Sequence, residues 1–202
     1  MYESMELLHQ AIVVHVPSTT RSGYLFFDEQ MGVLAVHMHA KRELSRGALV
    51  HYTPSASGSW YRARHVEIVA VPQRWATETI WFLHHLLELV AFFVPRAQRS
   101  EQIFELLSDV YRALDHEIDH RFFQKLFLCR FFILTGLYPE PRDAHHKNLL
   151  ALLTPRSARE RSNLFDEEKY VFLEKKMIQW IHECILLHPR ADRLKTMMTE
   201  PW

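Results

Sequence analysis

The chain has 202 residues, of which 48% are hydrophobic, and its 24 Lys and Arg residues balance 24 Asp and Glu residues. This length and apolar content supply enough material for one large core or two small ones, which argues against extended disorder. A formal charge of zero gives the whole chain no attraction for nucleic acid or a membrane surface, so either kind of binding must come from local charge clusters.

The cysteines and the first residues indicate a reducing setting. Cys129 and Cys184 fall in apolar helical patterns, where a thiol is most often a core residue. Acidic side chains occur within residues 1–6, where a signal peptide needs basic ones, and no apolar run reaches the ~18 residues of a membrane span. We therefore predict a cytoplasmic protein without disulfides.

The front of the chain has the pattern of short strands. Four of the five glycines lie in the first 58 residues, where apolar residues recur with a period near two. Strands are predicted at residues 9–16, 23–28, 32–39, 48–53 and 60–71, with turns at 30–32 and 55–58. Five short strands in about 70 residues favour a small closed barrel, because closure leaves no exposed sheet edge.

The rest of the chain has the pattern of helices. After Val71 and Pro72 the apolar period becomes helical, so we predict two domains, 1–72 and 73–202, and an α+β fold class. Helices are predicted at residues 80–93, 103–114, 122–134 and 167–187, with one short helix near 148–153 inside a long connection at 140–161. Gly136 and Pro139 mark the end of the third helix.

One short motif suggests zinc chemistry. His116-Glu117-Ile118-Asp119-His120 matches H-E-x-x-H, in which two histidines bind zinc and the glutamate is the base. The match lies between two predicted helices, is flanked by Asp115 and Arg121, and has no identifiable third ligand. A zinc hydrolase is therefore kept as an alternative, while we predict no metal, no cofactor and no catalytic residue. No P-loop, nucleophile elbow or dinucleotide fingerprint is present.

Local charge indicates a nucleic-acid interface. Between residues 41 and 64 there are five cations and one acid, Glu43. Cations that follow phosphates, interleaved with aromatic rings that stack on bases, are typical of a single-strand groove. The predicted DNA-binding residues are the cations Lys41, Arg42, Arg46, Arg62 and Arg64 and the aromatics Tyr52, Trp60 and Tyr61. The alternative is an ordinary solvated surface with the aromatics turned inward.

The order of these segments resembles the RecO family of recombination mediators. Residues 10–15, 22–28, 31–33, 40–42 and 47–50 are similar to the family's N-terminal OB-fold barrel. The apolar helix at 80–93, the Phe-rich helix closed by residues 136–139, and Arg193-Leu194-Lys195 after the last helix resemble its helical domain. The chain is shorter than usual at residues 140–161, where some relatives carry a four-cysteine zinc site that this sequence lacks.

The resemblance implies a five-stranded OB-fold-like barrel followed by an all-α domain, and a non-enzymatic factor in DNA repair. Such a factor binds single-stranded DNA and the C-terminal tail of single-strand-binding protein, works with RecR, and anneals strands or loads recombinase. The tail ends in acids and an aromatic residue, so its receptor needs an apolar pocket rimmed by cations. The third helix offers both, in Arg121, Phe122, Lys125, Leu126, Phe127 and Arg130. The alternative for this helix is that its aromatic residues fill the helical core while Arg121 caps the helix or pairs with Asp119. The alternative is an OB/helical adaptor that binds proteins and not nucleic acid.

Overall fold

The structure is a computed structural model that describes residues 8–17, 23–38, 43–58, 60–72, 77–112, 120–137 and 144–151, and eight positions between 166 and 179. By contacts, the chain divides into two compact units, residues 1–107 and 108–202. The domain boundary expected after residue 72 stays a prediction, because a division by contacts does not test which part folds alone.

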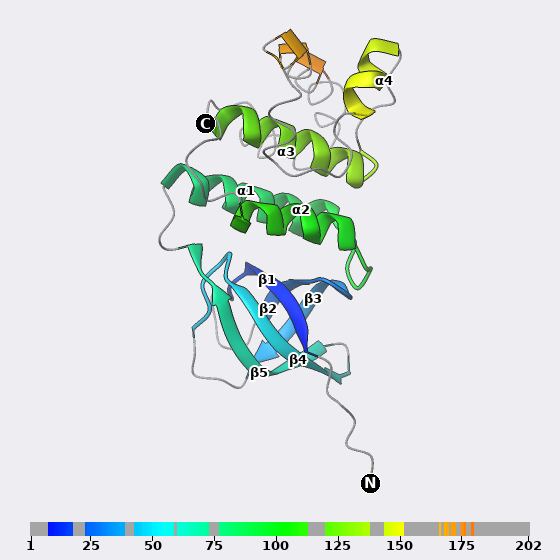
Figure 1. Ribbon diagram of the computed structural model, residues 1–202. Coiled ribbons are helices and arrows are strands. Elements are labelled where there is room, and N and C mark those ends of the chain that lie inside the picture. Colours follow the sequence, from blue (N-terminus) through cyan, green and yellow to red (C-terminus); the bar gives the residue numbers. More distant parts are fainter. Residues whose placement is uncertain are drawn as a thin grey trace. The chain divides into compact units, whose positions relative to one another are not determined.

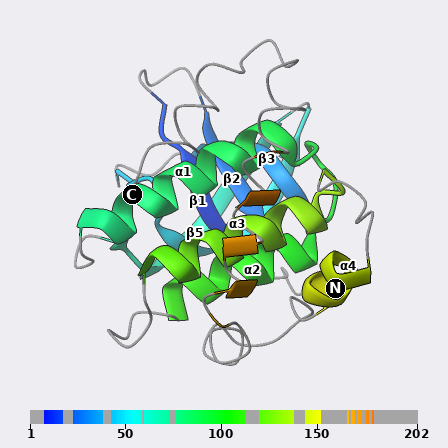
Figure 2. The same ribbon diagram turned by 90° about the horizontal axis from the view of Figure 1, so that it is seen from above.

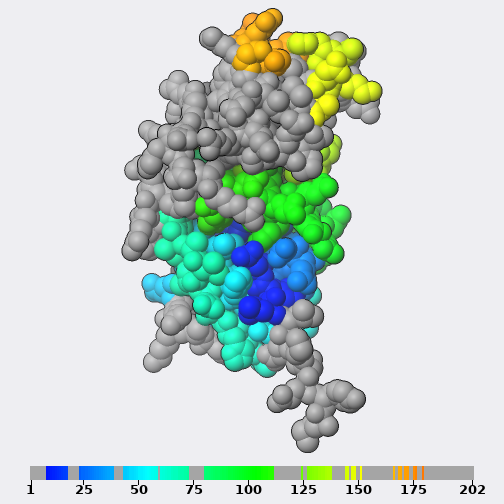
Figure 3. Space-filling model, in the orientation of Figure 1, coloured from blue at the N-terminus to red at the C-terminus, as the bar shows by residue number. Residues whose placement is uncertain are grey.

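The first unit contains a closed five-stranded barrel (Figure 1). Its strands are β1 (His9–His15), β2 (Tyr24–Asp28), β3 (Gly32–Met38), β4 (Leu49–Ser57) and β5 (Trp60–Ala70). They follow the order β1-β2-β3-β5-β4, with β4 paired back to β1, and only β3 and β5 run parallel. In the space-filling view, the blue atoms of β1 lie between β2 and β4 (Figure 3). The predicted OB-fold-like barrel is consistent with this topology.

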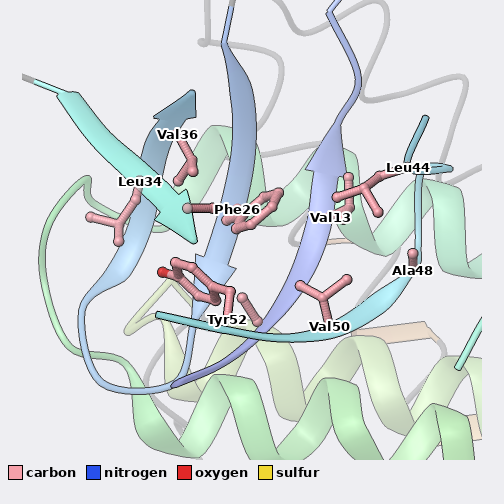
Figure 4. Close-up of a cluster of buried hydrophobic side chains, with 10 residues drawn as sticks. Val13, Phe26, Leu34, Val36, Leu44, Ala48, Val50 and Tyr52 are labelled. Carbon is pink, nitrogen blue, oxygen red and sulfur yellow. The ribbon is translucent and has the colours of Figure 1, made fainter. Parts of the chain in front are cut away.

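Every second side chain along the strands points into the barrel, and these side chains fill its interior. Ala11 and Val13 of β1 face inward, and so do Phe26 of β2 and Tyr52 of β4, whose rings meet edge to face with centroids 5.3 Å apart. The inward side chains form one buried cluster, which includes Leu34, Val36, Leu44, Ala48 and Val50 (Figure 4). Burying such side chains contributes roughly 1.5–3 kcal/mol for each large one.

A buried carboxylate joins three parts of the barrel. Asp28 is completely buried, and its Oδ2 accepts a hydrogen bond of 2.7 Å from the Tyr52 hydroxyl and lies 3.0 Å from His9 Nδ1. Its Oδ1 accepts the backbone N–H groups of Gln30 and Met31, at 2.8 and 2.7 Å. Asp28 therefore fixes the β2–β3 turn while the two side-chain partners tie β1 and β4 to it.

The outer side of the first strands packs against helical residues of the same unit. Helix α1 (Thr77–Phe93) crosses over β1 and β2 when the molecule is seen from above (Figure 2), and α2 (Glu101–Arg112) begins in the first unit and ends in the second. Ile12, Phe27 and Val33 point away from the barrel interior but are buried, and the Phe27 ring lies 5.7 Å from that of Phe104. These strands are apolar on both faces for that reason.

The connection between α1 and α2 is bonded to the edge of β3. The backbone N–H of Ala97 donates to the carbonyl of Val33 at 3.0 Å. Gly32 has a φ of 75°, and a β-carbon built on it would overlap the carbonyl oxygen of Gln98. Glycine is needed at this position for both its dihedral angle and its lack of a side chain.

The second unit contains α3 (His120–Leu134) and α4 (Ala144–Ala151). The N–H of Gly136 bonds to the carbonyl of Ile133, and that of Leu137 to the carbonyl of Phe132, which is the Schellman ending that the Gly136 signal indicates. Of the final helix predicted at 167–187, positions 168, 169, 171, 172, 175, 176 and 179 are described, and all are helical. No helix among the described residues is long and apolar enough to span a membrane.

Candidate nucleic-acid interface

The first residue of β5, Trp60, has an exposed aromatic side chain. The indole of Trp60 is 38% exposed, and its centroid lies 4.4 Å from that of the His37 ring on β3, with 43° between the planes. The parallel pairing of β3 with β5 places His37 opposite Arg62, which is also exposed. We call these three residues the Trp60 platform.

The alternation of β5 explains why the platform faces outward. Ala63 belongs to the buried cluster of the barrel, and the half-buried Tyr61 packs against it. Trp60, Arg62 and Arg64 therefore take the opposite face, where all three are exposed. The local sequence pattern thus brings one aromatic ring and two cations of the predicted interface to the same face of one strand.

A β-bulge ends the cationic part of this face. Thr53 pairs with Arg64 and His51 with Glu67, so β5 has one more residue than β4 between these pairs. His65 lies in the bulge and has a φ of 50°, in the left-handed region. Past the bulge the exposed charge changes sign, from Arg64 to Glu67.

Two aromatic residues of the predicted interface are not on the platform. Tyr52 is completely buried, so its ring offers no face to a base, and its assignment to the interface was wrong. Tyr61 points toward the barrel core, so it does not share the outer face with Trp60. The signal for Tyr52 was present in the sequence, because a residue two positions from Val50 lies on the same side of a strand.

Arg46 is engaged elsewhere in the first unit. Its Nη1 lies 3.3 Å from Glu88 Oε1, and its Nη2 donates to the carbonyl of His84 at 3.0 Å, both on α1. Burial, followed by the nearby Arg46 charge, lowers the pKa of His84 from its ordinary value. Arg46 therefore connects the β3–β4 loop to α1, whereas Lys41 and Arg42 lie outside the described residues.

The predicted tail receptor lies along α3. This helix contains Arg121, Phe122, Lys125 and Leu126, whose side chains lie outside the described part of the structure. Arg130 is half-buried, and Phe127 is only 2% exposed, so the Phe127 ring belongs to the interior of the second unit. The helix is confirmed, while the pocket stays a prediction.

The residues of the H-E-x-x-H match fall mostly outside the description. Residues 116–119 are not described, and His120 is the first residue of α3. Within the ranges that are described, no group of three His, Cys, Asp or Glu side chains could hold a metal ion. Cys129 is a buried thiol, and Cys184 lies outside the described part.

Sequence reasoning missed His37 as the neighbour of Trp60. Its position in β3 alternates correctly with the inward Val36, which marks it as outward-facing. It lies close to Trp60 because β3 pairs in parallel with β5. In the sequence β4 comes between these two strands, and no local pattern reveals such a pairing.

Comparison with protein-family models finds no match to this chain, and comparison with curated proteins finds none either. The resemblance to the RecO family thus depends on the segments quoted above, and the function has to be argued from the barrel and its outer face.

Proposed function

We propose that this protein is a non-enzymatic DNA-repair factor that binds single-stranded DNA at the Trp60 platform. The observation that supports this proposal is an exposed indole held beside His37 and next to Arg62 on the outer face of an OB-fold-like barrel. Barrels of this kind use their outer strands and adjacent loops to bind oligonucleotides. An unpaired base stacks on the indole, and Arg62 neutralises a neighbouring phosphate.

The proposed mechanism is coupled binding without covalent chemistry. The platform engages exposed nucleotides while α3 holds the acidic tail of single-strand-binding protein, so the second contact forms at a high effective concentration. In this proposal the protein acts with RecR, as the RecO resemblance implies, and promotes strand annealing or recombinase loading in the cytoplasm.

A second candidate is a protein–protein adaptor that uses the same barrel. It is favoured by the zero formal charge of the chain and by Ile68 and Val69 near the end of β5, which are 38% and 47% exposed. An adaptor of this kind binds no oligonucleotide, so the following titration distinguishes the two functions.

The test replaces one exposed tryptophan at a time. A fluorescently labelled single-stranded oligonucleotide is titrated with wild type, Trp60→Ala and Trp81→Ala, and binding is followed by anisotropy. Trp81 is the matched control, because it is 59% exposed on α1 and is not part of the platform. We expect Trp60→Ala to lose about 1–3 kcal/mol, about five-fold to about a hundred-fold in affinity, and Trp81→Ala to bind like wild type. Wild-type affinity in Trp60→Ala would refute the site.

A further inference from the structure

The residue just before β2 is a glycine whose missing side chain leaves room for the platform. A β-carbon built on Gly23 would lie 2.8 Å from Trp60 Cζ3 and 3.2 Å from Trp60 Cε3. It would also lie 2.9 Å from the carbonyl oxygen of Val36. The six-membered ring of the indole therefore occupies the place that any other side chain at position 23 would need.

Strand register shows how far the indole reaches. Tyr24 pairs with Val36, which brings the preceding residue, Gly23, beside the next residue of β3, His37. Because Trp60 belongs to β5, its ring extends from β5 across β3 to the start of β2. The indole is thus held against the outside of the barrel by three strands, with His37 at its side.

We propose that Gly23 is the positioning residue of the Trp60 platform. This inference rests on the proposed function, because it concerns how the same surface receives an unpaired base. With no side chain at position 23, the indole lies against the barrel and keeps one ring face for a base to stack on. Gly23 is not among the glycines with positive φ, so its role is the space it leaves and not an unusual backbone angle.

The pose is tested first without any ligand. The protein is labelled with 6-fluorotryptophan, which carries fluorine on Cη2 and not on the Cζ3 atom that approaches Gly23. The Trp60 signal is assigned by its loss in Trp60→Phe. In Gly23→Ala we expect the Trp60 signal alone to move and to gain a larger H₂O/D₂O solvent shift, with the other four tryptophan signals unchanged. An unchanged Trp60 signal would overturn the inference.

The binding effect is tested by a double-mutant cycle with the labelled oligonucleotide. Gly23→Ala should weaken binding at least five-fold in wild type and should have no further effect in Trp60→Ala, because it acts through the indole. Equal losses in both backgrounds would show that Gly23 acts through the barrel, and would refute the positioning role. If Trp60→Ala weakens binding but Gly23→Ala does not, the inference fails while the proposed function stands. If Trp60→Ala itself binds normally, the proposed function fails, and the fluorine signal still decides the pose.

A further variant covers the case in which Gly23→Ala folds poorly, since its β-carbon also approaches a backbone carbonyl. The phenyl ring of Trp60→Phe lacks the indole atoms that meet this β-carbon. We therefore expect Gly23→Ala to lower the melting temperature less in Trp60→Phe than in wild type. An equal loss in both backgrounds would assign the clash to Val36 and contradict the inference.

Discussion

At the residue scale, Tyr52 stabilises the barrel interior, although its aromatic ring had suggested a role in binding bases. Its hydroxyl donates to the fully buried Asp28 carboxylate, and its ring packs edge to face on Phe26. Burial, followed by the Asp28 charge, raises the pKa of Tyr52 well above its ordinary value, so the hydroxyl stays a donor throughout the usual pH range. Hydrogen bonds to charged groups are among the stronger ones, so this contact helps to define the barrel interior.

Tyr52→Phe should therefore destabilise the protein without affecting nucleic-acid binding. The variant keeps the ring and removes one hydrogen bond to a buried carboxylate, which should lower the free energy of unfolding by about 1.5–3 kcal/mol. Denaturant unfolding measures the loss, and the labelled oligonucleotide measures binding to the folded variant. Weaker binding by folded Tyr52→Phe would mean that the ring contributes to the interface after all.

Gly32→Ala should be much more destabilising than the same change at another glycine of similar geometry. Gly32 and Gly58 both have positive φ, at 75° and 65°, but only Gly32 faces a backbone group, at Gln98, while Gly58 has no atom within 4 Å of the built β-carbon. We expect Gly58→Ala to cost about 1–2 kcal/mol from the dihedral angle alone, and Gly32→Ala about 3 kcal/mol or more. Equal losses in denaturant unfolding would show that the connection after α1 does not pack against β3 in this way.

At the element scale, the strands and helices were largely predictable because their hydrophobic periods are clear. The predicted strand at 60–71 and the observed β5 differ by one residue. The predicted strand at 48–53 ends too early, because Pro54, Ser55 and Ala56 resemble a turn, whereas they pair with β5 in a long hairpin. Small and turn-forming residues can extend a strand when a partner strand supplies the hydrogen bonds, and this partner is not visible locally.

The Trp60 platform was only partly predictable for the same physical reason. Trp60 and Arg62 alternate with inward residues of their own strand, so the sequence locates them on one face. His37 reaches them through pairing between strands that are distant in sequence. Arg46 was expected at the interface from its charge, but Glu88 and the His84 carbonyl on α1 bind it, and these partners lie 42 and 38 residues away in the chain.

The exposed cation Arg62 on β5 is expected to contact a phosphate. Arg62→Glu should weaken binding of a single-stranded oligonucleotide and reduce the slope of log K against log salt by about 0.7 for the lost phosphate contact. Arg96→Glu is the control, because Arg96 is an exposed cation on the connection between α1 and α2. If the two variants change the slope equally, the effect reflects total charge and not a contact at the platform.

At the scale of the whole molecule, the proposed function needs two binding sites, one on the barrel for single-stranded DNA and one on α3 for an acidic tail. A peptide ending in Asp-Phe should bind wild type with an affinity that falls as salt rises, because its acids meet the cations of α3. Lys125→Glu should abolish this binding and leave the melting temperature unchanged. Equal binding by wild type and Lys125→Glu would move the tail site elsewhere, with Arg193 and Lys195 as the next candidates.

If the barrel binds single-stranded DNA through bases and phosphates, as we propose, the affinity of the wild-type protein must depend on salt. Affinity for a labelled single-stranded oligonucleotide is measured from about 50 to about 200 mM salt. If Arg62 and Arg64 each neutralise one phosphate, log K should fall linearly with log salt, with a slope of about −1.4 or steeper. Absence of binding at the lowest salt, or an affinity that does not change with salt, would refute DNA binding by the barrel.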